Sequence, residues 1–121
     1  MNKNAISIIF VIILVSTIGF AQDQNEMEKI NFLIASVENA NGMTFIRNGA
    51  EYDAKAAADH LRLKLRKASN RVRTAEDFIK YCASKSSMSG EPYRIKFSDG
   101  TMTDSESYLR KQLLRFEKGK K

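Results

Sequence analysis

The sequence predicts a small, helix-rich α+β domain, with about four helices around a short two-stranded sheet. Four segments repeat apolar residues every three or four positions, which is the period of an amphipathic helix. Two shorter segments are rich in β-branched or aromatic residues and end in Asn-Gly or Asp-Gly, as strands that enter turns do. A lone pair of strands is marginal in water, so the helices are expected to cover it.

The segment over 1–21 has the pattern of a cleaved signal peptide. Lys3 precedes an apolar run over 6–20, and small residues stand three and one positions before the expected cut between Ala21 and Gln22. The run is shorter than the ~20 residues of a bilayer span, so stable membrane insertion is not expected after cleavage. The chain is therefore expected to be exported, to the periplasm or the extracellular medium.

Residues 22–121 are expected to form one globular domain with a basic C-terminal tail. A chain of this size supports one hydrophobic core. The single cysteine, Cys82, has no partner in the chain, so packing rather than a disulfide must hold the fold. The whole chain has 20 Lys and Arg against 14 Asp and Glu, with the excess over 62–73 and 110–121. This charge serves solubility or attracts anionic envelope polymers, and nothing resembles an aromatic-studded surface for nucleic acid.

The first half of the domain predicts a helix, a strand and a second helix. The first helix covers 26–37 and has one apolar stripe. The strand covers 43–47 and ends at the Asn48-Gly49 turn. The second helix covers 52–68, and small or apolar residues occupy a ~100° arc of it, with Leu63 on the opposite face. The small side chains on that arc let a neighbouring helix approach closely.

The second half repeats this order. Thr74 is the expected N-cap of a short helix over 75–83. A strand follows over 92–98 and ends at an Asp99-Gly100 turn; its inward-facing residues are expected to be Tyr93, Ile95 and Phe97. A capping box of Thr103 and Glu106 is expected to start the last helix, over 104–116, which buries Leu109, Leu113 and Phe116.

Much of the chain between Phe45 and Tyr93 resembles a family of small bacterial envelope proteins that have a signal peptide and a domain of unknown function. The serine-rich loop with its flanking helix and strand is the most specific part, with a TAExFIxxCASxSSxSGxPYxI-type pattern. The resemblance implies export, and it implies no activity, substrate or cofactor. Its motifs are Phe45-Ile46-Arg47-Asn48-Gly49, Ala57-Ala58-Asp59-His60-Leu61-Arg62, Thr74-Ala75-Glu76-Asp77-Phe78-Ile79, Cys82-Ala83-Ser84-Lys85-Ser86-Ser87-Met88-Ser89-Gly90 and Pro92-Tyr93-Arg94-Ile95.

The serine-rich loop after the third helix is the first candidate ligand-binding site. Hydroxyls and free backbone N–H groups bind phosphate, carboxylate or sugar, and a lysine adds charge. The alternative is that the serines cap the helix end and shape a turn before Pro92. The loop residues in the candidate site are Ser84, Lys85, Ser86, Ser87, Ser89 and Gly90, together with Tyr93 beyond the loop.

His60 and Lys64 complete the candidate site, because residues four apart on a helix are neighbours. They would grip an anion together with the serine loop. The alternative is a histidine that is hydrogen-bonded at the margin of the core, beside a lysine whose methylene stem covers apolar surface.

Cys82 and His60 also raise the possibility of a Cys/His-dependent hydrolase or transferase. Against it, Cys82 lies near the end of its helix, where the helix dipole opposes a thiolate, and within the apolar stripe. A buried structural thiol is expected instead. The sequence has no usual zinc ligand set, calcium loop, nucleotide-binding glycine motif or serine-nucleophile motif, so no metal or cofactor is expected.

These observations favour an exported, non-catalytic binding or interaction module. Its expected partner is an envelope protein or a small anionic ligand. The Cys/His enzyme and the cationic binder of anionic envelope polymers remain the alternatives.

Overall fold

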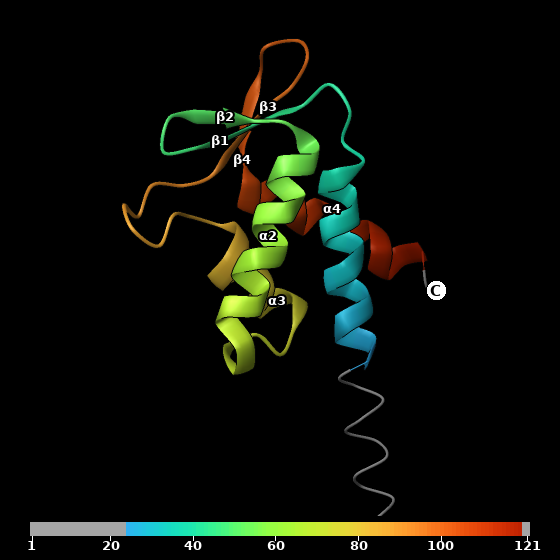
Figure 1. Cartoon of the computed structure of the whole chain (residues 1–121). Helices are drawn as coiled ribbons and strands as arrows, with labels where there is room; N and C mark the ends of the chain where they lie inside the picture. The colour runs from blue at the N-terminus through green and yellow to red at the C-terminus, as the bar shows by residue number, and fades with distance from the viewer. Residues whose placement is uncertain (1–23, 120–121) are drawn as a thin grey trace, which may run out of the picture.

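The computed structural model describes residues 24–119, in which helices pack against a four-stranded antiparallel sheet. Figure 1 shows the sheet at one end of the helices. This architecture confirms the α+β class. The predicted signal peptide and its cleavage site fall outside these residues. Within the described range, no helix combines the length and the hydropathy needed to cross a bilayer.

The helices of residues 24–119 follow the predicted order. The first covers 24–38, α2 covers Ala54–Ala68, and a 3-10 turn, η1, follows at Ser69–Arg71. The third predicted helix is split into an α-helical half, α3 (Ala75–Phe78), and a π-helical turn, η2 (Ile79–Ala83). The last helix, α4, covers Ser105–Gly119. Thr74 caps α3 as predicted, since its side chain accepts the backbone N–H of Asp77.

The sheet has four strands, so the prediction of a two-stranded sheet is wrong. The strands are β1 (Thr44–Arg47), β2 (Ala50–Tyr52), β3 (Arg94–Lys96) and β4 (Met102–Asp104), in the order β2-β1-β3-β4. The two missed strands have three residues each, which is too short to show an alternating pattern. Both are the second arms of hairpins whose turns the sequence does mark.

The first hairpin turn shows why β2 forms. Asn48 and Gly49 both have positive φ, of 51° and 79°, and Arg47 pairs directly with Ala50. Two residues with positive φ make a type I′ turn, whose twist returns the chain along the strand it has just left. The Asn-Gly signal therefore leads into a strand here, and not directly into the helix.

The capping box predicted for the last helix is also wrong. Thr103 pairs with Ile95 inside the sheet, so it belongs to β4 and does not start the helix. Asp104 takes that place, because its carboxylate accepts the backbone N–H of Ser107 at 3.0 Å. The helix consequently begins one residue later than predicted.

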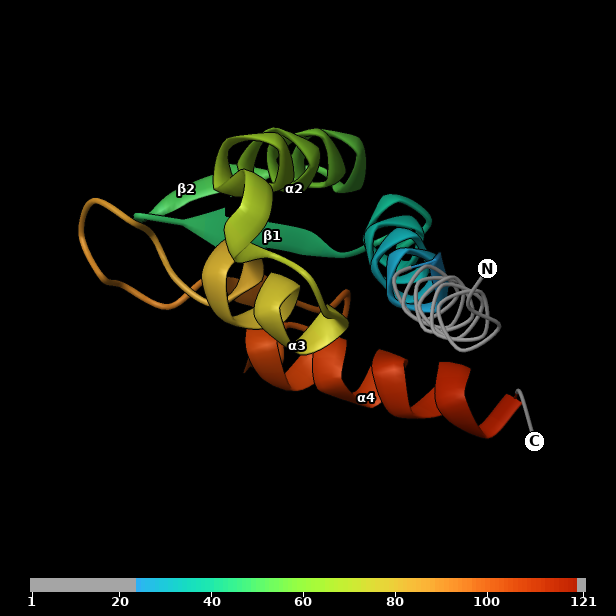
Figure 2. The same ribbon diagram turned by 90° about the horizontal axis from the view of Figure 1, so that it is seen from below.

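The core lies between the sheet and the helices. Phe45 and Ile95 pair across β1 and β3 and are both buried. Figure 2 shows α3 between α2 and α4, which explains why Phe78 is completely buried. Leu63, predicted on the outer face of α2, is 39% exposed. The helical residues of the core are Ile30, Leu33, Ile34, Val37, Ala58, Leu61, Ala68, Ala75, Phe78, Ile79, Cys82, Ala83, Leu109 and Leu113.

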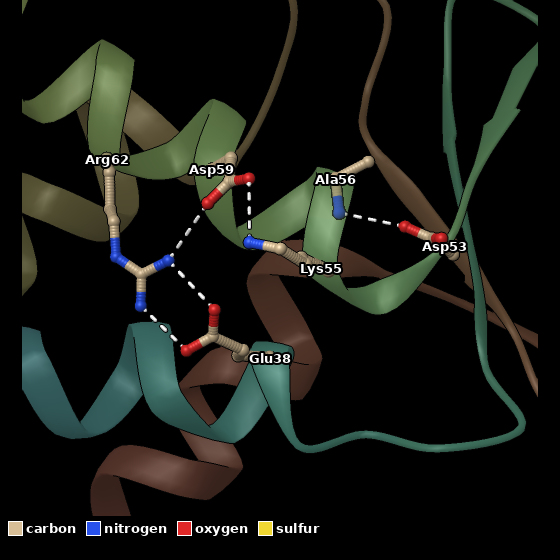
Figure 3. A network of polar contacts seen from close by, with 6 residues as sticks. All are labelled: Glu38, Asp53, Lys55, Ala56, Asp59 and Arg62. Atoms are coloured by element: carbon tan, nitrogen blue, oxygen red, sulfur yellow. Dashed lines mark hydrogen bonds and ion pairs between the residues drawn. The ribbon is translucent and has the colours of Figure 1, made fainter.

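A polar network joins α2 to the end of the helix over 24–38 (Figure 3). The Arg62 guanidinium donates to both carboxylate oxygens of Glu38, at 2.8 and 3.0 Å, and also to Asp59. These two hydrogen bonds fix the relative orientation of the two side chains, in addition to the attraction between their charges. The hydrogen bond from Arg62 accordingly lowers the pKa of Glu38. The network helps fix the position from which α2 faces the sheet.

Candidate functional site

The strand register brings the polar side chains of Arg47, Tyr52 and Tyr93 to one region of the sheet, on the side that faces the helices. Phe45 pairs with Tyr52 on one side and with Ile95 on the other. Because side chains alternate along a strand, Arg47 shares the side of Phe45, and Tyr93 shares the side of Ile95. His60 and Lys64 of α2 reach this region, since both contact Tyr93.

The Tyr93 hydroxyl is the meeting point of the helix and the sheet. The Lys64 ammonium donates to it at 3.0 Å and lies 5.1 Å from the centre of the Tyr93 ring. His60 Nε2 is 3.4 Å from the same hydroxyl, and the two rings meet edge to face. The prediction that His60 and Lys64 are neighbours is therefore confirmed, and they share one buried tyrosine.

Arg47 extends this group toward β2. Its Nη1 lies 3.3 Å from both ring nitrogens of His60. In the ring plane, the Cε1 atom between the nitrogens would block such an approach, so Nη1 lies over the face of the imidazole. Nη2 donates to the Tyr52 hydroxyl at 3.1 Å, and the guanidinium carbon is 5.3 Å from the centre of the Tyr52 ring. We call Tyr52, Arg47, His60, Tyr93 and Lys64 the cation–aromatic cluster.

The cation–aromatic cluster carries uncompensated positive charge. Within residues 24–119, neither Arg47 nor Lys64 forms an ion pair with a carboxylate, whereas Arg62 pairs with two. Burial lowers the pKa of His60, and the charges of Arg47, Lys64 and Lys67 lower it further. The lowered pKa favours the neutral imidazole, so the formal positive charges of the cluster are those of Arg47 and Lys64.

A small pocket of about 50 Å³ adjoins the cluster. Its polar lining includes Arg47, Tyr52, His60 and Tyr93. Its apolar lining comes from the helix over 24–38, from β1 and from α2, namely Val37, Phe45, Ala57 and Leu61. The cavity is therefore lined mainly by apolar surface, with a smaller polar part that includes Arg47, Tyr52, His60 and Tyr93.

The hydroxyls of Ser86 and Ser89 are occupied by hydrogen bonds within the serine loop and to Asn48. Ser86 is only 5% exposed, and its hydroxyl oxygen is within hydrogen-bond distance of the backbone N–H groups of Met88 and Ser89. Asn48 donates to Ser86 and accepts from Ser89, which ties the loop to the first hairpin turn. These contacts support the alternative that Ser86 and Ser89 shape the turn before Pro92 instead of binding a ligand.

The other loop residues do not join the cation–aromatic cluster through their side chains. Ser84 donates to the Ile79 carbonyl at 2.6 Å and so caps the π-helical turn. Ser87 is exposed, and Gly90 has a φ of +76°, which favours glycine. Lys85 contributes its backbone carbonyl to Lys64, while a separate open groove is lined by Ser84 and Lys85.

Cys82 is fully buried in the π-helical turn. Burial raises the pKa of its thiol, and Lys64 and Arg71 only partly oppose that effect. Among the described residues, no hydrogen bond joins Cys82 to His60. The prediction of a buried thiol is confirmed.

No three residues among the His, Cys, Asp and Glu of 24–119 lie closely enough together to hold a metal ion.

We expect Cys82 to resist iodoacetamide in the native protein at pH 7.5 and to react readily in urea. The reason is that only an accessible thiolate is nucleophilic, and the thiol is buried with a raised pKa. Mass spectrometry of alkylated samples measures the difference. Rapid native labelling would contradict a purely structural role and would restore the Cys/His enzyme hypothesis.

Sequence reasoning missed Arg47 and Tyr52. The helical period of the sequence places Tyr52 at the start of the second helix, but Tyr52 lies in β2. Arg47 was assigned correctly to a strand without a role. One signal was available, because Arg47 is two positions from Phe45 and so shares its core-facing side. A permanently charged group at such a position needs either a partner or a function.

Comparison with known proteins identifies an uncharacterized relative and a family of unknown function. It is 42% identical over 69 residues to the uncharacterized protein YfeK of Salmonella typhimurium, and the match covers 57% of this chain and 58% of that relative. No solved structure matches the chain. A model of a family of unknown function (DUF5329) matches residues 24–117, and this chain therefore belongs to that family.

Proposed function

We propose that this protein is an exported, non-catalytic binding module and that the cation–aromatic cluster is its site for a small anionic ligand. The observation that carries the proposal is that two cations of residues 24–119 form no ion pair with a carboxylate: Arg47, which lines the pocket, and Lys64, which contacts the pocket residue Tyr93. Charges held next to a cavity without a counterion favour an anion in that cavity.

The hydrogen-bonding capacity of the two cations supports this role. The Arg47 guanidinium has five N–H donors, and its contacts engage only His60 and Tyr52. Lys64 has three donors, of which two reach the Tyr93 hydroxyl and the Lys85 carbonyl. The Tyr93 hydroxyl accepts from Lys64 and also lies within hydrogen-bond distance of His60 Nε2, so the donors left for a ligand are those of Arg47 and Lys64. The cluster can therefore donate several hydrogen bonds to one anion.

The export part of the proposal is supported by the signal-peptide pattern over 1–21. An envelope location would expose the site to extracellular solutes. The alternative of a broad cationic surface is less well supported, because part of the basic excess is paired. Arg62 contacts Glu38, and Arg110 contacts Glu76 and Glu106.

The test compares Arg47→Gln with Arg66→Gln in the chain over 22–121. Both substitutions remove one positive charge, but Arg66 is exposed on α2 and, within residues 24–119, forms no hydrogen bond or ion pair with the cluster. ¹⁵N-HSQC titrations with acetate and phosphate at constant ionic strength measure the dissociation constants. We expect shifts centred on β1, α2 and Tyr93, and at least about a tenfold loss of affinity in Arg47→Gln alone, because hydrogen bonds to charged groups contribute about 1.5–3 kcal/mol.

Two results would overturn the proposal. One is the absence of saturable shifts with every anion. The other is an equal loss of affinity in both variants, which would mean that net charge, and not this site, attracts anions.

A further inference from the structure

We infer that the ligand is a short aliphatic carboxylate, whose carboxylate lies against Arg47 and whose alkyl group enters the adjoining pocket. This inference rests on the proposed function, because it specifies the chemistry of the anion that the cation–aromatic cluster holds. It comes from the two kinds of residue that line the pocket, which are called its apolar side and its polar side below.

The apolar side of the pocket indicates that the ligand has an apolar end. Val37, Phe45, Ala57 and Leu61 line that side, from a helix, a strand and another helix. Phosphate, sulfate or formate would leave this surface in contact with water. An alkyl group would bury it, and each methylene removed from water contributes favourably.

The volume of the pocket limits the length of that group. The pocket holds about 50 Å³, about one third of the ~150 Å³ of an engineered apolar cavity that binds benzene. Two or three carbons beyond the carboxylate fill such a space. Propionate and butyrate therefore match the pocket, whereas hexanoate would leave part of its chain in solvent.

The polar side favours a carboxylate over a cation or a neutral head group. The Arg47 guanidinium is planar and presents paired N–H groups that fit the two oxygens of a carboxylate. A cationic ligand would be repelled by Arg47, Lys64 and Lys67.

The test is a chain-length series of formate, acetate, propionate, butyrate and hexanoate, with phosphate as the anion without an alkyl group. Dissociation constants come from NMR titrations of the chain over 22–121 at constant ionic strength. We expect affinity to rise about three- to fourfold per carbon as far as propionate or butyrate, and to rise no further for hexanoate. N-acetylalanine mimics the C-terminus of a peptide, because it has a methyl side chain next to a carboxylate and an amide in place of the preceding peptide bond. If it binds more tightly than propionate, the ligand is the carboxylate at the end of a peptide chain. If it binds more weakly, the ligand is a free carboxylic acid.

Two substitutions in α2 provide a matched pair. Ala57 lines the pocket, whereas its neighbour Ala56 is exposed and does not. We expect Ala57→Leu to fill the pocket and to remove the dependence on chain length, while Ala56→Leu leaves the series unchanged. Val37→Ala enlarges the pocket from the other wall and should shift the optimum toward longer acids. It keeps the test valid if Ala57→Leu fails to fold.

The outcomes separate this inference from the function on which it rests. Equal affinity for all acids and for phosphate would overturn the inference and leave anion binding intact. No binding of any anion would overturn both. An unchanged chain-length series in Ala57→Leu would show that the alkyl group lies elsewhere and would also overturn the inference.

Discussion

Carboxylate binding is expected to strengthen as the pH falls from about 8 to about 5.5, because His60 takes up a proton when the anion binds. In the free protein, burial and then Arg47, Lys64 and Lys67 lower the pKa of His60, so the imidazole stays neutral below its ordinary value of 6.5. A bound carboxylate offsets that repulsion and raises the pKa. Tyr93 faces His60 directly, and Tyr52 contacts the Arg47 guanidinium that lies over the imidazole.

The sign follows from linkage, since a site that gains a proton on binding has higher affinity where protons are abundant. The gain is about tenfold for each unit by which the anion raises the pKa of His60. Titration calorimetry with propionate, in two buffers with different enthalpies of ionisation, measures the proton uptake directly. In His60→Asn, both the uptake and the pH dependence should disappear. Wild-type binding that is independent of pH over this range would contradict a role for His60 beside the anion.

Replacing Phe78 with alanine is expected to cost about 3–5 kcal/mol of the free energy of unfolding. Phe78 is completely buried in α3, which lies between α2 and α4 (Figure 2), so its loss leaves a cavity where three helices meet. For a domain of about 100 residues, each kcal/mol lowers the melting temperature by about 4–8 °C. The midpoint should therefore fall by at least about 12 °C.

The matched control is Tyr81→Ala, in the π-helical turn next to α3. Tyr81 is 44% exposed and contacts Lys80. It should cost under about 1 kcal/mol, because less of its ring leaves water on folding. Urea unfolding followed by circular dichroism measures both variants. Similar losses in the two would mean that α3 does not depend on the core for its position.

The helices could be predicted from the sequence because their signals are local. An apolar period of three to four residues defines a helix without reference to any distant residue, and Thr74 caps α3 through a neighbour three positions away. The burial of Cys82 followed from its place in a helical apolar stripe, and the burial of Ile95 followed from the alternation of side chains along a strand. The short strands β2 and β4 could not be found in this way, because three residues carry no measurable alternation and their stability comes from pairing with β1 and β3.

The candidate site shows the same division. His60 and Lys64 were found together because four residues on one helix make them neighbours. The serine loop is predicted as a site because hydroxyls bind ligands. In the structure, however, Asn48 donates a hydrogen bond to the Ser86 hydroxyl from 38 residues away in sequence, a contact that no local pattern indicates. Arg47 and Tyr52 could not be predicted as part of the site, because it is the β1–β2 hairpin that brings them next to His60 and to each other.

By itself, the sequence determined the helical segments, the Thr74 cap, the hairpin turns and the side chains available for chemistry, because each depends on residues within a few positions of one another. The tertiary structure alone decided that Arg47, His60 and Tyr93 meet at one pocket. That meeting depends on strand register and on the position of α2 over the sheet. Both are set by packing and pairing between residues far apart in the chain, and no local pattern encodes them.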